Sequence, residues 1–529
     1  MRQFLIVLAI VAGGVALLMV AGPAPQRPAK TFTFNNGAEP ETLDPALMTG
    51  VPEHTLAMAL FEGLVTYHPK TLKPVPGVAK SWTISDDGLT YTFHLRACRW
   101  SNGDPLGATD FLQSWRRALE PKTAAEYAYQ LWHIKNARAY TEGKITDFSK
   151  VGVRVIDERT LEVRLENPAA YFLELLAFET FMPVHTRCLA LHGKKWTRVG
   201  KIVCNGPFVL AQWLPRHRIV MHKNPLYWDA AAVKLDQVVA YPIDDENTAL
   251  RTYKAGKIHW LNALPNPLIP RLKKHPHYRK APYLGTYFYR FNCTRPPFND
   301  RRVRIAFNLA LDKDRICRYV LHGEYQPARA FVPPMMPPYQ SPDGMAYAPQ
   351  KAAALLADAG YPAGKGFPRV TLIYNTSKRH QRIAEVAQKQ WKETLGVDIN
   401  LVSQEWKVYL KTVSTLDYDI ARSAWIGDYL DPKTFLDMFV TGGGNNRTGW
   451  SHKRYDQLIA QTDRTADAAA RLELFREAEK ILVCDELPVM PVHFYVNLSL
   501  LHPSVQGFYG NPRDLHPFKY IDINQAAPK

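Results

Sequence analysis

The chain has 529 residues, and because one hydrophobic core stops growing at about 250–300 residues, a single compact lobe is excluded. Hydrophobic residues make up 46% and charged residues 22%, which is typical of globular proteins and excludes a disordered or fibrous chain. The formal net charge is +17, but the basic clusters are short and scattered, so we expect a solvated basic surface and no nucleic-acid partner.

The first 24 residues are typical of an export segment. Arg2 precedes an uncharged run from Leu5 to Ala21, whose length lies between that of a signal-peptide core and that of a membrane span of about 20 residues. We expect residues 1–24 to be either a cleaved signal peptide or a retained N-terminal anchor, and no cysteine follows the run at a lipid-anchor site. In both cases the rest of the chain works outside the cytoplasm, and the predicted location is the periplasm. Residues 31–36 then alternate as a strand does.

The first half of the chain is rich in predicted hairpins. Asp87-Gly88 and Asp157-Glu158 each stand between two alternating apolar runs, which predicts two β-hairpins. Between them, Thr109 or Asp110 is predicted to cap a helix that covers 111–119.

The second half alternates helices with strands. Helical spacing predicts helices over 349–359 and 380–395, each followed by a glycine, and a further helix over 468–482 that Asp467 caps. Apolar runs at 370–374 and 397–402 predict the strands between them. This alternation indicates an α/β lobe.

The sequence contains no motif of a metalloprotease, a serine hydrolase or a nucleotide-binding enzyme. We therefore predict no catalytic residue, no metal and no cofactor, although catalytic triads are spatial and an exported hydrolase stays open as an alternative. The six cysteines match no zinc spacing. Cys188 and Cys204 enclose a segment with a polar centre, and we expect either a disulfide there or two buried thiols.

Twelve segments carry a family resemblance in chain order, among them NNGAEPETLDP at 35–45, WSNGDPLGATDFLQSW at 100–115, PPFNDRRVRIAFNLALDKD at 296–314 and ARSAWIGDYLDP at 421–432. Together they resemble the family-five solute-binding proteins of bacterial ABC importers, and most closely the peptide-binding branch. The resemblance implies an α/β, two-lobed, type II-like binding-protein fold with hinged lobes. Lobe I would comprise 30–51, 178–284 and 496–529, lobe II would comprise 285–495, and 52–177 would form an extra hairpin-rich domain on lobe I.

The same resemblance implies the activity and the partners. The chain would capture short peptides between the two lobes, as a monomer, and deliver them to membrane permease subunits and ATPases of an ABC importer. The alternatives within the binding class are a modified cell-wall peptide or another small amphiphile as the ligand.

Four residues of the second lobe match ligand-binding positions of the family. Asp428 would pair with the peptide amine, with a turn-capping role as the alternative. Arg422 would meet the peptide carboxylate, unless it forms an internal salt bridge. His380 would lie near the C-terminal end of longer ligands, or cap a helix. Trp425 would wall a side-chain pocket, with core packing as the alternative.

Three further residues match positions that line the cleft. Trp406 is a second predicted pocket wall, with core packing as the alternative. Tyr127 and Glu39 match cleft positions of the first lobe, and contact with the ligand is left open for both.

The sequence also departs from the peptide-binding pattern. Arg290 stands where the family usually has Glu, Leu321 replaces a Lys, and Val413 replaces an Arg. The change of sign at Arg290 predicts that the receptor disfavours Lys-rich peptides and prefers acidic or uncharged ones. The alternative is that Arg290 turns away and pairs with an internal acid.

Overall fold

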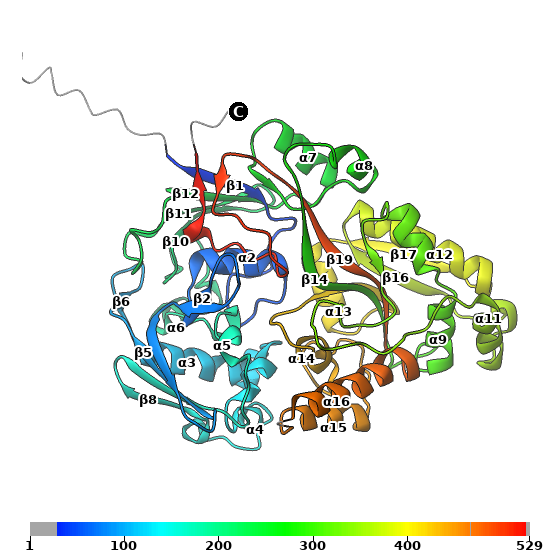
Figure 1. Cartoon of the computed structure of the whole chain (residues 1–529), viewed down its shortest axis with the longest axis horizontal. Helices are drawn as coiled ribbons and strands as arrows, with labels where there is room; N and C mark the ends of the chain where they lie inside the picture. Colours follow the sequence, from blue (N-terminus) through cyan, green and yellow to red (C-terminus); the bar gives the residue numbers. More distant parts are fainter. Residues whose placement is uncertain (1–28, 466, 525–529) are drawn as a thin grey trace, which may run out of the picture.

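A computed structural model describes residues 29–465 and 467–524 of the chain. Two lobes lie side by side, with the long strands β14 and β19 running between them (Figure 1). The predicted signal peptide or anchor at 1–24 lies outside the described residues. Among the described residues, no helix is long and apolar enough to cross a membrane.

One eleven-stranded sheet runs through both lobes. Its first-lobe strands are, in spatial order, β10 (Phe208–Leu214), β11 (Arg218–Lys223), β12 (Gln237–Tyr241), β1 (Thr31–Asn35) and β13 (Trp260–Leu261). The sheet continues through β19 (Val489–Leu501), β14 (Tyr278–Phe291), β18 (Ile420–Ile426), β16 (Val370–Asn375) and β17 (Ile399–Gln404), and β15 (Gln326–Pro327) pairs with β19. The first predicted strand, 31–36, is therefore β1.

The pairing of β14 with β19 is interrupted between the lobes. Pro282 lies opposite Val496 and Thr286 lies opposite Phe494, so three residues of β14 face a single residue of β19. Such an irregularity removes regular ladder bonds and lets the strands bend. This irregularity lies at the predicted lobe boundaries, after residues 284 and 495. Two strands that pass from one lobe to the other, with a local break in their pairing, are typical of a hinge.

The predicted hairpins are confirmed, and they form a separate four-stranded antiparallel sheet. Its order is β4 (Ala79–Ile84), β5 (Thr90–Leu95), β9 (Thr160–Arg164) and β8 (Val153–Asp157). Helix α3 (Ala108–Leu119) begins earlier than predicted. Its N-cap is Gly107, and Asp110 lies in the first turn, where its carboxylate accepts the Gly107 N–H at 2.9 Å, so the predicted caps are wrong.

The α/β rhythm of the second half is also confirmed. Helices α11 (Pro349–Asp358) and α12 (Lys378–Leu395) alternate with the parallel strands β16 and β17. Asp467 caps α16 (Ala468–Lys480) by accepting the Ala470 N–H at 2.7 Å. The other helices are α2 (Val51–Leu60), α4 (Ala137–Thr141), α5 (Phe172–Leu175), α6 (Thr186–His192), α7 (Glu246–Lys254), α8 (Ile269–Leu272), α9 (Arg301–Leu309), α10 (Lys313–Arg315), α13 (Trp406–Ser414), α14 (Lys433–Leu436) and α15 (Lys453–Thr462).

One hydrophobic core is shared between the extra domain and the second lobe. Phe93 and Trp115 of the extra domain belong to the same buried cluster as Phe288, Trp425 and Tyr429 of the second lobe. Because this cluster crosses the gap between the lobes, the lobes are in contact and the structure is a closed one.

The expected disulfide between Cys188 and Cys204 is wrong, and the alternative of two buried thiols holds. All six cysteines lie within the described residues and are free. The Cys188 thiol donates to the carbonyl oxygen of Lys201 at 3.0 Å. Burial raises the pKa of Cys204 to about 12, which keeps it from the thiolate form that builds disulfides.

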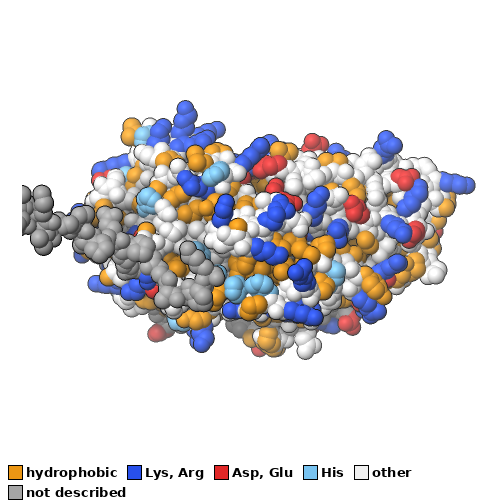
Figure 2. Space-filling model, turned by 90° about the horizontal axis from the view of Figure 1, so that it is seen from above, with side chains coloured by type: hydrophobic (Ala, Val, Ile, Leu, Met, Phe, Trp, Pro, Cys, Tyr) orange, Lys and Arg blue, Asp and Glu red, His pale blue; other side chains and the backbone are white. Residues whose placement is uncertain are grey.

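The positive charge gathers in the first lobe. Residues 178–284 contain seventeen lysines and arginines against six acidic residues. Figure 2 shows Lys and Arg side chains spread over the upper face among apolar and neutral ones, not gathered in one groove. This distribution agrees with the predicted solvated basic surface.

Candidate functional site

A cavity of about 870 Å³ lies between the two lobes. All eight residues predicted from the sequence line it, although they come from six separate places in the chain. They are Glu39 after β1, Tyr127 of the extra domain, Arg290 on β14, His380 on α12, Trp406 on α13, Arg422 and Trp425 on β18, and Asp428 just after β18. The volume falls within the range of roughly 300–1,000 Å³ that ligand pockets usually have.

Contacts between the lobes close the cavity. Tyr171 stacks on Tyr429 with ring centroids 4.5 Å apart, and Tyr127 stacks on Trp425 at 6.0 Å. Polar contacts cross the same gap: Trp406 donates to Glu53 at 3.3 Å, Asn445 to the Tyr129 hydroxyl at 3.3 Å, and Arg447 forms an ion pair with Glu126. A ligand bound there would therefore be shielded from much of the solvent, which strengthens any electrostatic contact made inside.

Asp428 forms the acidic end of the cavity. Its side chain is buried, and the carboxylate accepts a hydrogen bond from the neutral amide of Gln130 at 2.8 Å. Burial raises the pKa of Asp428 well above its ordinary value, which the positive charge of Arg513 opposes only in part. Burial therefore disfavours the ionised carboxylate, and a ligand cation beside Asp428 would favour it. The backbone N–H of Asp428 donates to the Thr434 hydroxyl oxygen at 2.9 Å, so the side chain of Thr434 stabilises the turn at Asp428.

Arg422 lies at a basic end of the cavity and forms no internal salt bridge within the described residues. Its guanidinium donates to Asn375 at 3.0 Å and to the Tyr495 hydroxyl at 2.5 Å, both neutral groups, and lies 4.6 Å above the Tyr287 ring. Its buried Nε atom has no acceptor. The salt-bridge alternative is therefore wrong, and the positive charge of Arg422 is uncompensated.

His380 lies beside Arg422, in surroundings that favour the neutral imidazole. Burial lowers its pKa well below the ordinary value, and the cations of Arg422 and Arg379 act in the same direction. Its Nδ1 atom is buried without a partner. Its backbone N–H donates to the hydroxyl oxygen of Ser377, the N-cap residue of α12, at 3.5 Å, so Ser377 and not His380 caps this helix. The imidazole is thus free to bind a neutral or anionic group.

Arg290 is the most isolated charge of the cavity wall. It is 4% exposed, its guanidinium lies 5.4 Å from the Phe288 ring, and its Nε and Nη1 atoms have no acceptor. Among the described residues, Arg290 forms no ion pair with an acidic side chain, so the alternative of an internal salt bridge is wrong.

Aromatic side chains form the other walls. Trp425 donates its Nε1 hydrogen to the Thr434 carbonyl at 2.6 Å, which fixes the ring, and Trp406 stacks on Tyr409 at 5.9 Å. Glu39 differs from the other predicted residues, because its carboxylate is already taken by Trp213 at 2.6 Å and the Arg216 N–H at 2.9 Å. It orients the rim of the first lobe, and a ligand would compete with these bonds.

One edge of β18 is open to the cavity. β16 pairs with β18 only at Ile420 and Ala421, and the following residues, 422–426, have no strand partner on that side. All five line the cavity. An unpaired strand edge offers backbone N–H and C=O groups to an extended ligand.

Sequence reasoning missed several residues of the site. Gln130, Glu126 and Arg447 carry no local signal, because each acts through a partner about 300 residues away in the chain or more. Asn375 and Tyr495 do fall inside segments that carry the family resemblance, YNTSKRH and MPVHFYVN. A search for polar residues in those segments would have found them.

Comparison with known proteins gives consistent matches. Residues 73–447 match the family described as bacterial extracellular solute-binding proteins, family 5 Middle. The chain is 38% identical over 517 residues to the periplasmic oligopeptide-binding protein OppA of Escherichia coli (strain K12), covering 95% of this chain and 94% of that protein. A structure of Haemophilus influenzae OppA in complex with RPPGFSPFR is 32% identical, has a TM-score of 0.90, and covers 94% of this chain and 99% of that one.

Two structures of a third protein, MppA, distinguish an open arrangement of the lobes from the arrangement seen here. A structure of the Escherichia coli murein tripeptide binding protein MppA is 34% identical, with a TM-score of 0.90, covering 94% of this chain and 99% of that one. The unliganded open form of MppA covers 94% and 98% but has a TM-score of 0.62. Because the protein is the same, the lower score reflects a different arrangement of its parts, and the present structure does not have the open arrangement.

Proposed function

Because this chain belongs to family 5 of the bacterial extracellular solute-binding proteins, we propose that its cavity binds a short peptide with the amino terminus at Asp428 and the carboxylate at Arg422. The chain is a peptide-binding receptor of an ABC importer and not an enzyme. It works in the periplasm or outside the cell. The single observation that carries the proposal is a buried carboxyl group at Asp428 that faces a closed cavity with only a neutral partner.

A peptide provides what each end of the cavity lacks. Its ammonium group supplies the cation that Asp428 needs, and its carboxylate supplies the anion that Arg422 lacks. A guanidinium can hold a carboxylate through two parallel hydrogen bonds. Between these ends, the open edge of β18 can bond to the peptide backbone, which has the same groups whatever the side chains. Buried polar groups of the ligand are thus satisfied, as a closed cavity requires.

Chemically blocked peptides test this proposal. We expect acetylation of the amino terminus of a tripeptide to weaken binding at least thirtyfold, because it removes the ammonium group from a buried ion pair. Amidation of the carboxyl terminus should weaken binding through Arg422. Calorimetry on the free, acetylated and amidated forms of one tripeptide measures both effects. Equal affinity for the free and acetylated forms would overturn the placement of the amine.

The partners and the attachment follow from the same family. We propose that the receptor delivers its peptide to two membrane permease subunits and two cytoplasmic ATPases. We also propose a periplasmic location, with export directed by residues 1–24, either as a cleaved signal or as a retained anchor.

A cell-wall peptide is the second candidate ligand. The MppA structure is described as that of a murein tripeptide binding protein. Two arginines without an acidic partner, Arg290 and Arg422, favour a peptide of this kind that carries more than one carboxylate. Binding of a carboxylate-rich tripeptide in preference to trialanine would support this candidate, and the reverse preference would exclude it.

A further inference from the structure

Arg290 presents a buried charge that nothing in the described part of the protein balances. It pairs through its backbone with Ala421 on β18 and Val489 on β19, so its position is fixed by two neighbouring strands. A guanidinium keeps its charge at every physiological pH and cannot relieve its burial by losing a proton. Leaving such a charge unpaired in a buried position is costly, and Arg290 lines the ligand cavity. An anion from the ligand is the group that this position lacks.

The strand register separates Arg290 from Arg422. Arg290 lies opposite Ala421, whereas Arg422 lies opposite Tyr289. Because successive side chains of a strand point to opposite faces of the sheet, the two guanidinium groups leave the sheet on opposite sides. Their ring contacts agree, since Arg290 lies by Phe288 and Arg422 by Tyr287. One carboxylate therefore cannot bridge both, and each arginine requires an anion of its own.

The face that carries Arg290 also carries a side-chain pocket. Ser423 and Trp425 follow Ala421 at every second position of β18, so they share the Arg290 face, and Ser423 lies opposite Phe288. Asn445 and Arg447 come from the loop between α14 and α15, and all of these residues line the cavity. We call the group of Arg290, Ser423, Trp425, Asn445 and Arg447 the Arg290 subsite.

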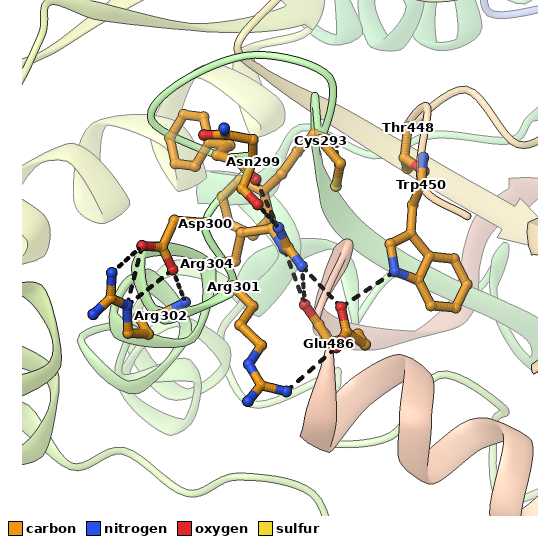
Figure 3. Close-up of polar contacts among 11 residues, drawn as sticks. Cys293, Asn299, Asp300, Arg301, Arg302, Arg304, Thr448, Trp450 and Glu486 are labelled. Carbon is orange, nitrogen blue, oxygen red and sulfur yellow. Dashed lines mark hydrogen bonds and ion pairs between the residues drawn. The ribbon is translucent and has the colours of Figure 1, made fainter. Parts of the chain in front are cut away.

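The loop that carries Asn445 and Arg447 is held firmly in place. The N–H of Cys293, two residues after the end of β14, donates to the carbonyl oxygen of Thr448 at 2.8 Å. Figure 3 shows Trp450 reaching Glu486, which Arg304 also binds; the Trp450 bond measures 3.5 Å, and Arg304 Nε donates to the Glu486 carbonyl at 2.9 Å. The subsite is therefore preorganised, which lowers the cost of ordering it when a ligand binds.

The second cation of the subsite is already engaged. Arg447 forms an ion pair with Glu126 of the extra domain, across the gap between the lobes. The hydroxyl of Tyr418 donates to the Arg447 carbonyl oxygen. Arg447 is thus used for closing the lobes, and Arg290 is left to meet the ligand.

We propose that the Arg290 subsite binds the carboxylate of an acidic side chain, so that the receptor selects peptides with one free amino terminus and two carboxylates. This inference rests on the proposed function, in which Asp428 and Arg422 take the two termini. The wall of Trp425 would cover the methylene groups of the side chain, and Ser423 and Asn445 could add hydrogen bonds to the same carboxylate.

Matched tetrapeptides test the proposal. The frame is tetraalanine, and Glu, its uncharged isostere Gln, or Lys replaces the second or the third residue. We expect Glu at one of these positions to bind about tenfold tighter than Gln or better, with Lys the weakest. Arg290→Gln should remove this preference, so that the Glu and Gln peptides bind this variant with equal affinity. Arg318→Gln, a change of an exposed arginine outside the cavity, is the control and should keep the preference.

The outcomes distinguish this inference from the proposed function. If tetraalanine binds, but the Glu and Gln peptides bind with equal affinity at both positions, only the inference is overturned. A preference for Glu that survives Arg290→Gln would overturn the inference as well. Failure of every peptide to bind the natural protein would overturn the proposed function and the inference with it. If Arg290→Gln does not fold, Arg290→Lys takes its place: it keeps the positive charge and should keep a preference for the Glu peptide. Equal affinity of Arg290→Lys for the Glu and Gln peptides would refute the inference.

Discussion

Replacing Asp428 with Ala is expected to weaken peptide binding by about 2–5 kcal/mol, which is about 30-fold to several thousand-fold in Kd. The change leaves the ligand ammonium without its counter-charge inside a closed cavity. Asp428 is 7% exposed, and the side-chain partner of its carboxylate, Gln130, is neutral, so Gln130 cannot supply the missing charge.

Elementary electrostatics accounts for both limits of this range. Two unit charges 3 Å apart attract by about 5–6 kcal/mol at an effective dielectric constant of 20, which gives the upper limit. Burial raises the pKa of Asp428, because the empty site disfavours the anion, and the positive charge of Arg513 offsets part of that cost. Ionising the carboxyl group therefore consumes some of the attraction, and the net effect falls toward the lower limit.

Calorimetry with one tripeptide and its acetylated form measures the effect. Asp428→Ala should bind the free peptide weakly, and acetylation should then cost little more, because both changes remove the same ion pair. Asp86→Ala, a change of an exposed aspartate outside the cavity, should leave binding unchanged. Undiminished affinity of Asp428→Ala for the free peptide would refute the assignment.

Three further predictions concern stability, thiols and closure. Burial raises the pKa of Glu53 to about 7, so unfolding releases its proton between about pH 4.5 and 7, and the free energy of unfolding falls as the pH rises through that window. In denaturant titrations of the peptide-bound protein, the free energy of unfolding of Glu53→Gln should match that of the natural protein at pH 4 and exceed it by about 3 kcal/mol at pH 8. Equal stability of the two proteins at pH 8 would contradict this reasoning. Alkylation of the denatured, unreduced protein should label all six cysteines, and finding Cys188 and Cys204 unlabelled would contradict the structure. Saturation of ligand-free protein with a binding peptide should lower its radius of gyration in small-angle scattering, because the ligand contacts both lobes only when they are closed, and an unchanged radius would count against hinged closure.

The parts of the fold that local rules determine could be predicted from the sequence. Asp87-Gly88 between two alternating runs gave a hairpin with the correct strands, and the alternation of helices with strands in the second half gave the α/β lobe. The N-terminus of α3 was misplaced because Asp110 acts from inside the first turn, where its carboxylate bonds back to Gly107, and a cap and a first-turn acid look alike in sequence.

Contacts between distant segments could not be predicted. The disulfide between Cys188 and Cys204 seemed reasonable from spacing, but the fold buries both thiols and gives Cys188 a backbone acceptor at Lys201 instead. The eight residues taken from the resemblance all line one cavity, but the resemblance could not show that the Glu39 carboxylate already accepts a hydrogen bond from Trp213. That knowledge requires the side-chain partners, which come from other parts of the chain.

Because side-chain partners come from distant parts of the chain, the sequence could predict only part of the environment of Arg290. Its change of sign relative to the family was visible, whereas its lack of an acidic partner was not, because an internal acid could have come from anywhere in the chain. The strand register then supplied a second fact that no sequence pattern contains, which is that Arg290 and Arg422 leave the sheet on opposite faces.

Mass spectrometry of the ligands that co-purify with the protein tests the central claim most directly. The protein is purified without added peptide, denatured, and its small-molecule fraction is sequenced by fragmentation. The account predicts short peptides with free amino termini, enriched in Asp or Glu side chains over Lys. A bound non-peptide molecule, or peptides with blocked amino termini, would contradict the account.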